Sequence, residues 1–241
     1  YGNPEKPKQM WEFVEGTRGI SDACDAITLK DNPSDPTPII AGNVSFYNES
    51  KNGPIPPSPI VSCLGRLKNI DYVLPMDFQS SGSDILMVGE RRDELGGSIY
   101  YQLLGELGAN VPKPDFVEVR SQIFAITDCA EKKLVLSCHD ISDGGIATSI
   151  AEMTFRKSIG CLVTIPGDLE IHKTLFCETG GFVIETKKEN TEKVKKVFEE
   201  HGLNALKIGK TGGDYIQLNE TIKIKVHEAR HRWENGLREK L

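Results

Sequence analysis

Apolar residues recur at helical spacing near both ends of the chain. The pattern over residues 10–27 places one apolar residue every three or four positions, which predicts a helix with a single apolar face. That face is formed by Ile20, Ala23, Cys24 and Ile27. Gly16 and Gly19 interrupt the pattern, and a glycine costs about 1 kcal/mol relative to alanine inside a helix. We therefore expect a break there, or a helix packed closely on a sheet or a ligand.

A second helix is predicted at the C-terminal end by the same spacing. Its apolar positions are Val226, Ala229, Trp233, Leu237 and Leu241. Between the two ends, residues 37–47 and 59–67 form strand-like runs joined by a polar, proline-rich connection, which predicts a hairpin with a long loop. A compact apolar run over residues 84–88 predicts one more strand.

The pattern changes near Glu90, where the strand-rich stretch ends and strands begin to alternate with helices. We therefore expect two domains, residues 1–90 and residues 91–241, and a mixed α/β (α+β) fold. Helices are expected in the second domain over 99–107, 121–131, 145–155 and 190–201, followed by the C-terminal helix. Strands are expected there over 134–138, 161–165, 181–186, 205–208 and 215–218.

Composition and charge exclude several function classes. The chain has 241 residues, 38% of them hydrophobic and 27% charged, as is typical of a soluble globular protein. Its net charge is -6 and its basic residues are interspersed with acidic ones, so no nucleic-acid partner is expected. No run approaches the roughly 18 apolar residues of a membrane span, and residues 1–6 lack the pattern of an export signal.

The six cysteines show no C-x-x-C spacing and mostly lie in apolar or strand-like contexts. This arrangement predicts reduced, buried thiols in a cytoplasmic protein. The chain begins with a tyrosine and a turn-like Gly-Asn-Pro instead of a methionine, from which we expect a fragment or a processed chain.

The segment S-C-H-D-I-S-D-G-G, residues 137–145, gives the strongest indication of a binding site. It follows an apolar strand-like run and precedes an amphipathic helix, so its N–H groups and the helix dipole could hold a phosphate. Asp140 and Asp143 would repel that phosphate unless a divalent cation lay between them, and carboxylates suit Mg²⁺. Alternatively, Ser142 or Asp143 only caps the helix.

Two other segments combine glycine with small polar residues. In A-G-N-V-S-F-Y-N-E, residues 41–49, Gly42 would let a ligand approach the backbone closely. Asn43 and Ser45 are two positions apart and would project to the same side of an extended chain, where they could hold a metal ion and a substrate hydroxyl. Alternatively, they form the solvent face of a hairpin strand. The glycine pair in residues 94–98 is either an anion site or only a capped turn.

The order of these motifs resembles the small, bacterial and archaeal form of the synthetase subunit of phosphoribosylformylglycinamidine synthase, a member of the aminoimidazole ribonucleotide synthetase-like (PurM-like) superfamily. The resemblance covers essentially the whole chain. It rests on N-P-E-K-P at 3–7, W-E-F-V-E-G and R-G-I within 11–20, G-N-V-S-F-Y-N-E at 42–49, L-G-G-S at 95–98 and H-D-I-S-D-G-G at 139–145.

The resemblance implies a parent built by tandem duplication, in which each half has a barrel-forming sheet domain and an α/β domain. Residues 1–90 would be part of the second barrel-forming domain, and residues 91–241 would be the second α/β domain. The family's catalytic histidine and main nucleotide contacts belong to the first half. No catalytic residue is therefore assigned here, and the chain is expected to be inactive alone.

The resemblance also implies an ATP-dependent C–N ligase with ATP and Mg²⁺ as cofactors and glutamine as the amido donor. It would convert formylglycinamide ribonucleotide to the amidine in purine biosynthesis. Gly42 would contact ATP, Asn43 would bind Mg²⁺ and Ser45 would contact this nucleotide substrate. The turn that would hold a phosphate or a metal-nucleotide comprises Asp140, Ser142, Asp143, Gly144 and Gly145. The implied partners are a glutaminase subunit, a small accessory subunit and the N-terminal half of the parent chain.

The chain departs from the family pattern at C-E-T-G-G-F, residues 177–182, where relatives carry a Ser/Glu-rich run with an arginine. Two other functions stay open. One is a different ATP-dependent member of the superfamily, such as a selenophosphate or thiamine-phosphate kinase relative, against which residues 42–49 argue. The other is a non-catalytic module that binds nucleotide or scaffolds a partner.

Overall fold

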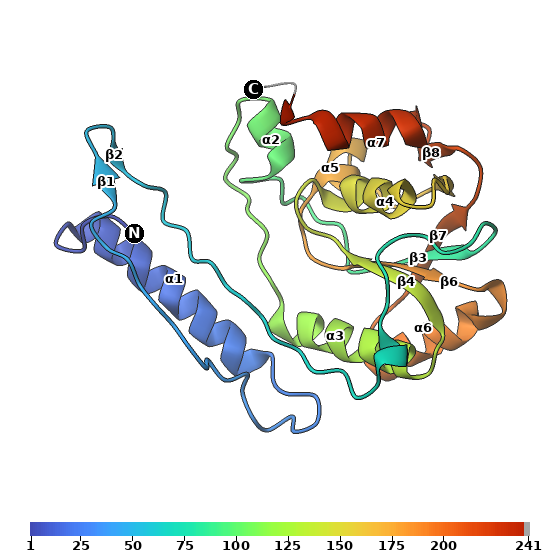
Figure 1. Ribbon diagram of the computed structural model, residues 1–241, viewed down its shortest axis with the longest axis horizontal. Coiled ribbons are helices and arrows are strands. Elements are labelled where there is room, and N and C mark those ends of the chain that lie inside the picture. Colours follow the sequence, from blue (N-terminus) through green and yellow to red (C-terminus); the bar gives the residue numbers. More distant parts are fainter. Residues whose placement is uncertain (239–241) are drawn as a thin grey trace. The chain divides into compact units, whose positions relative to one another are not determined.

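The computed structural model describes residues 1–238 and divides into two compact units, Tyr1–Arg66 and Leu67 onward (Figure 1). This division lies earlier than the boundary expected near residue 90. The strand β3 (Asp84–Val88), whose five residues are all buried, pairs with two strands of the second unit, β6 (Phe182–Thr186) and β7 (Leu206–Thr211). The identity of each domain in the duplicated parent stays a prediction.

The first unit contains the predicted N-terminal helix, α1 (Pro7–Ala26), which passes through both glycines without a break. Its expected apolar face is half-buried. A Cβ atom on Gly16 would lie 2.7 Å from the Tyr1 hydroxyl, whereas one on Gly19 would have no neighbour within 4 Å. Close contact with a side chain therefore explains Gly16, and nothing in the structure explains Gly19.

The predicted strands over 37–47 and 59–67 are wrong. The first unit instead has a two-residue ladder between β1 (Glu49–Ser50) and β2 (Gly53–Pro54). An extended segment becomes a strand only where another strand takes up its backbone hydrogen bonds, and no described residue pairs in this way with the two runs. Most of their apolar side chains are also exposed: Ile40 is 80% exposed and Ile60 is 99% exposed.

The second unit is built on a seven-stranded sheet in the order β4-β6-β3-β7-β5-β8-β9. Its further strands are β4 (Val135–Asp140), β5 (Cys161–Val163), β6 (Phe182–Thr186), β7 (Leu206–Thr211), β8 (Tyr215–Leu218) and β9 (Ile222–Lys225). Neighbours are antiparallel except for the parallel pair β5 and β8. Together with the helices of this unit, the sheet confirms the predicted mixed α/β (α+β) fold class.

Helices pack on both faces of this sheet (Figure 1). One face is covered by α4 (Gly145–Phe155), α5 (Ile171–Phe176) and α7 (Val226–Asn235), with the fully buried Ile146, Ile150 and Met153 of α4 at its centre. The other face carries α3 (Phe116–Glu131) and α6 (Thr191–Glu200) over the β4-β6-β3 part. The remaining helices are η1 (Ile70–Tyr72), α2 (Ile99–Leu103) and η2 (Lys188–Asn190).

Most predicted elements of the second unit are confirmed, with shifted ends. Helix α3 begins at residue 116 instead of 121, because Asp115 caps it by accepting the N–H groups of Val117 and Glu118. Helix α2 stops at residue 103, shortly before Gly105 takes a left-handed φ of 74°. The short α5 and β9 are not among the predicted elements. Leu241, assigned to the last helix, lies outside the described residues.

None of the six cysteines forms a disulfide bond. Cys129, Cys161 and Cys177 are buried, and burial raises the pKa of Cys161 to about 12. Cys63 is exposed, so the prediction of a buried thiol is wrong at that position. Within residues 1–238, no helix combines the length and apolar character needed to cross a membrane.

Candidate functional site

The glycine-rich turn between β4 and α4 has the position predicted from the sequence. Strand β4 ends at Asp140, Gly144 is the N-cap residue of α4, and Gly145 is its first residue. Both glycines have left-handed φ values, 77° and 68°, which other residues rarely adopt. A Cβ atom on Gly145 would lie 2.7 Å from the carbonyl oxygen of Leu175, so the turn packs directly on the backbone of α5.

Neither Ser142 nor Asp143 caps α4. The carboxylate of Glu178 takes this role, because its Oε1 atom accepts the N–H of Gly144 at 2.8 Å and the N–H of Ile99 at 2.8 Å. One carboxylate oxygen thus joins the turn before α4 to the start of α2. The Glu178 carboxylate therefore binds the N–H of Gly144, which is expected from the sequence to bind a phosphate.

The L-G-G-S segment is a capped turn at the start of α2. The Ser98 hydroxyl oxygen accepts the N–H of Tyr101 at 3.2 Å and donates to the Leu95 carbonyl oxygen at 2.7 Å. A Cβ atom on Gly96 would lie within 2.9 Å of three backbone atoms of Asn110. The first glycine is therefore required by close backbone packing. Of the two interpretations of this segment, an anion site or a capped turn, the structure agrees with the capped turn.

Further hydrogen bonds fix the loop that carries Glu178. Thr179 donates to Glu94 at 2.9 Å between buried side chains, and Arg91 donates to the Gly180 carbonyl oxygen at 2.9 Å. Burial lowers the pKa of Arg91, while the neighbouring Cys177 opposes this shift. The segment that departs from the family pattern therefore connects the two glycine motifs of the second unit.

His139 lies beside the turn and is held between two carboxylates. Its Nε2 atom is 3.0 Å from Glu152 Oε2 and its Nδ1 atom is 3.2 Å from Asp140 Oδ1. Glu152 also accepts the indole N–H of Trp233 at 3.0 Å. Asp140, Ser142 and Asp143 remain exposed at the surface. No group of three or more histidine, cysteine or acidic side chains in residues 1–238 could hold a metal ion.

Gly42, Asn43 and Ser45 lie in the first unit, on an exposed segment without regular secondary structure. The segment is anchored from Ser45 onward, because the Ser45 carbonyl oxygen accepts a hydrogen bond from the amino group of Tyr1 at 2.9 Å and the Phe46 ring packs on Phe13. Within the described part of the chain, the side chains of Asn43 and Ser45 have no hydrogen-bond partner. Their amide and hydroxyl groups are available to a ligand, and their roles stay predictions.

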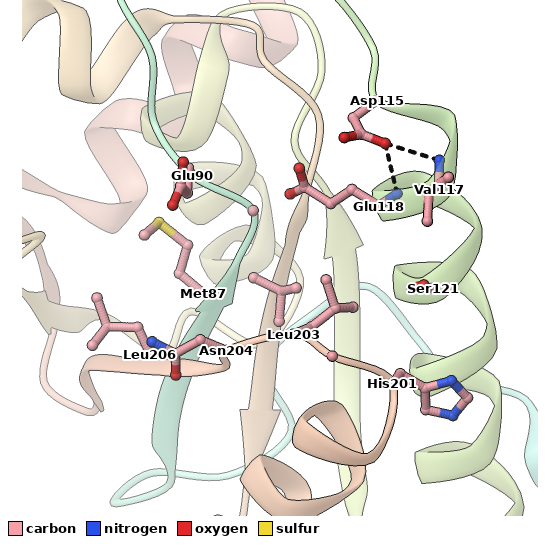
Figure 2. Close-up of a pocket in the computed structure, with 13 residues that line it drawn as sticks. Met87, Glu90, Asp115, Val117, Glu118, Ser121, His201, Leu203, Asn204 and Leu206 are labelled. Atoms are coloured by element: carbon pink, nitrogen blue, oxygen red, sulfur yellow. Dashed lines mark hydrogen bonds between the residues drawn. The ribbon is translucent and has the colours of Figure 1, made fainter.

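Figure 2 shows a pocket of about 650 Å³ in the second unit, between the end of β3, the first half of α3 and the loop from α6 to β7. Met87, Leu203 and Leu206 contribute apolar surface to it, and Glu90 and Glu118 contribute carboxylates. None of the predicted site residues lines this pocket. The residues that line the pocket come from three separate stretches of the chain, and no motif in the sequence connects these stretches.

Replacing Glu178 by alanine is expected to speed amide exchange at Gly144 and Ile99 and to lower the free energy of unfolding by about 2 kcal/mol. Hydrogen bonds to a charged acceptor contribute about 1.5–3 kcal/mol. Hydrogen exchange read by NMR, with urea unfolding, measures both effects. Glu178→Gln keeps an oxygen acceptor and should lose less. Glu220→Ala, at an exposed turn, is the control and should change little. Unchanged exchange in Glu178→Ala would contradict this assignment.

Comparison with known proteins identifies relatives of the whole chain. The family described as "AIR synthase related protein, C-terminal domain" matches residues 80–218. The phosphoribosylformylglycinamidine synthase subunit PurL of Methanothrix thermoacetophila is 39% identical over 246 residues, covering 99% of this chain and 32% of that protein. The PurL subunit of Thermoplasma acidophilum is 35% identical, covering 98% and 31%. The chain thus spans about a third of the length of these curated relatives.

Solved structures show the same fold at lower sequence identity. Thermotoga maritima PurL complexed with FGAR has a TM-score of 0.58 and 17% identity, over 67% of this chain and 30% of that one. The same protein complexed with ATP has a TM-score of 0.55 and 16% identity, over 67% and 28%. From the match over residues 80–218 and this shared fold, we conclude that the chain belongs to the AIR synthase related protein family.

Proposed function

We propose that this chain is part of an ATP-dependent ligase that forms formylglycinamidine ribonucleotide in purine biosynthesis. The observation that carries the proposal is the 39% identity to a PurL subunit over 99% of the chain. The two most specific motifs, residues 42–49 and 139–145, support it, and each falls on a turn or an irregular segment with exposed polar side chains.

The reaction would activate an amide whose oxygen is a poor leaving group. The amide oxygen attacks the γ-phosphate of ATP and ADP leaves, which gives an imidoyl phosphate. Ammonia then attacks the amide carbon, and phosphate departs with the former amide oxygen. The remainder of the complete protein would carry the catalytic histidine, so this chain would contribute binding and positioning.

In this scheme, Gly42 lets ATP approach the backbone, since no atom lies within 4 Å of its open side. Ser45 positions the ribonucleotide, and positioning can supply several kcal/mol of the barrier. Asn43 fits a cation, because its amide oxygen is exposed and has no partner in residues 1–238. When bound, Mg²⁺ would neutralise charge on the transferring phosphate.

The turn after β4 would serve the nucleotide through its exposed side chains. Asp140, Ser142 and Asp143 face solvent, and their oxygens suit a metal-nucleotide. Gly144 and Gly145 are buried and shape the turn, and the N–H of Gly144 is taken by Glu178. A direct phosphate contact at Gly144 would therefore require Glu178 to move away.

The partners in this proposal are a glutaminase subunit that releases ammonia from glutamine, a small accessory subunit and the remaining two thirds of the relatives' length. A solved structure described as PurLQS from Thermotoga maritima contains a chain with this fold. The 241 residues alone would be inactive, and the complete protein would be cytoplasmic.

A second candidate function is a non-catalytic module that binds nucleotide. It is favoured by one observation, the carboxylate of Glu178 on the turn that would otherwise receive a phosphate. Nucleotide binding without ribonucleotide-dependent turnover by the complete protein would support this alternative over the ligase.

Replacing Asn43 by alanine in the complete protein is expected to reduce amidine formation at least about 100-fold, because phosphate charge would lose a metal ligand. The rate of ADP release at saturating ribonucleotide and ammonia measures the effect. Asn52→Ala, at an exposed turn of the same unit, is the matched control and should keep wild-type turnover. Wild-type turnover in Asn43→Ala would refute the assigned role.

A further inference from the structure

Among residues 67–238, no helix covers one half of the sheet on one of its two faces. On the face covered by α3 and α6, the buried core draws its strand residues from β3, β4 and β6. The described residues of β5, β8 and β9 instead contribute to the core on the opposite face. Along β5, for example, Cys161 and Val163 are buried, whereas Leu162 between them is 56% exposed on the uncovered side.

The strand register shows which side chains share this uncovered side. Directly paired residues lie on the same face, so Leu162 is flanked by Lys210 on β7 and by Gln217 on β8. Gln217 lies opposite Lys223 of β9, and Tyr215 lies opposite Lys225. Lys207 joins them through its pairing with Leu86. We call this surface the lysine face: Leu162, Lys207, Lys210, Tyr215, Gln217, Lys223 and Lys225.

The positive charge of the lysine face is mostly unbalanced. Lys207 pairs with the buried Asp84 at 2.7 Å. Among the described residues, however, Lys210, Lys223 and Lys225 form no ion pair with a carboxylate. Lys223 and Lys225 instead lie 5.2 Å and 6.0 Å from the centre of the Tyr215 ring. A chain with a net charge of -6 thus gathers unpaired cations on one exposed sheet surface.

Protection of a sheet edge explains only part of this arrangement. Lysines on an edge strand prevent unwanted strand pairing, which accounts for Lys223 and Lys225 on β9. Lys210 and Leu162 lie on the interior strands β7 and β5, where no edge needs protection. Cations around an exposed leucine and tyrosine are instead what an acidic, partly apolar partner would complement.

We propose that the lysine face is a docking surface for one acidic, amphipathic helix of another protein. Four neighbouring strands span about 14 Å between their outer axes, which matches the 10–12 Å diameter of a helix with its side chains. Glutamates of the helix would meet the three unpaired lysines, and its apolar residues would cover Leu162 and Tyr215. This inference is independent of the ligase function and of the residues assigned to it.

The chemistry of the surface favours a protein over a nucleic acid. A phosphate backbone would use only the lysines and would leave Leu162 and Tyr215 without an apolar partner. The contact is small, so the affinity should be micromolar or weaker and should fall with added salt.

The test uses a fluorescein-labelled helical peptide with glutamates flanking a leucine stripe, titrated with the 241-residue chain and followed by fluorescence anisotropy. The double variant Lys210→Glu/Lys223→Glu is expected to weaken binding at least about 10-fold, because it reverses the charge of the surface. The control Lys8→Glu/Lys132→Glu makes the same change in net charge at exposed positions elsewhere and should stay within about twofold of wild type. Leu162→Gln should weaken binding a few-fold, which a purely ionic contact would not do.

If a charge-reversal variant fails to fold, as judged by circular dichroism, Lys210→Gln/Lys223→Gln replaces it, with the same expected direction. The proposal is overturned if the peptide does not bind, or if both double variants lose affinity equally. It is also overturned if a single-stranded oligonucleotide binds the face more tightly than the peptide. Sedimentation that shows the chain associating with itself through these lysines would equally replace the proposed partner by a second copy.

Discussion

Replacing Gly145 by alanine is expected to lower the free energy of unfolding of the second unit by more than about 3 kcal/mol. Its φ of 68° already costs a residue with a side chain about 1–2 kcal/mol. The new methyl group would also lie 2.7 Å from the Leu175 carbonyl oxygen and 2.8 Å from that of Cys177. Both contacts are with backbone, which cannot rotate away as a side chain would.

Gly202→Ala is the matched control for this experiment. Gly202 has a similar φ, 75°, but a Cβ atom there would have no neighbour within 4 Å. It should therefore lose only about 1 kcal/mol, and thermal unfolding would separate the variants because each kcal/mol shifts Tm by about 2–4 °C in a domain of this size. Equal losses in the two variants would show that the turn does not pack on α5 as described.

Replacing Glu185 by alanine is expected to cost at least about 3 kcal/mol. This residue of β6 is fully buried, and its carboxylate accepts hydrogen bonds from Gln79 N at 2.6 Å, Ser80 N at 3.0 Å and the Ser137 hydroxyl at 2.9 Å. Its removal leaves the buried Ser137 hydroxyl and the N–H groups of the half-buried Gln79 and the exposed Ser80 without this acceptor, and each buried unsatisfied group costs about 1–3 kcal/mol. Urea denaturation of the purified chain measures the loss.

Glu185→Gln distinguishes the contribution of the negative charge to stability from that of the side-chain volume, because glutamine has nearly the same volume without the charge. The amide keeps one oxygen acceptor but places an NH₂ group against a donor, so an intermediate loss is expected. Glu189→Ala, at an exposed position of the short helix η2 that follows β6, should change stability by less than about 0.5 kcal/mol. A loss below about 1 kcal/mol in Glu185→Ala would contradict the view that its carboxylate holds residues 79 and 80 on the sheet.

Elements with a strong local pattern could be predicted from the sequence. The strands over 84–88 and 215–218 and the helix over 145–155 agree with the structure at both ends. Each combines a compact or periodic apolar pattern with a clear boundary, such as the glycine pair before α4. Elements that depend on distant partners could not be predicted: residues 37–47 and 59–67 have strand-like composition but no strand to pair with in the described chain.

The candidate site could be predicted only in part, because it too depends on residues that are distant in the sequence. The sequence places two glycines at the start of α4, and the left-handed φ values of both explain why glycine is needed. It gives no sign that Glu178, 34 positions away from Gly144, supplies the cap. Capping is recognised from residues next to a helix, and a carboxylate from a distant loop leaves no local pattern. The roles of Gly42, Asn43 and Ser45 rest on the family resemblance and await experiment.

The proposed ligase function is tested most directly by the stoichiometry of turnover by the complete protein that contains these residues. ADP and formylglycinamidine ribonucleotide would be measured together, with ATP, Mg²⁺ and ammonia present and with formylglycinamide ribonucleotide either present or omitted. We expect both products in equal amounts, and only when the ribonucleotide is present. ADP release at the same rate with and without the ribonucleotide, or the absence of the amidine product, would contradict the proposed ligase function.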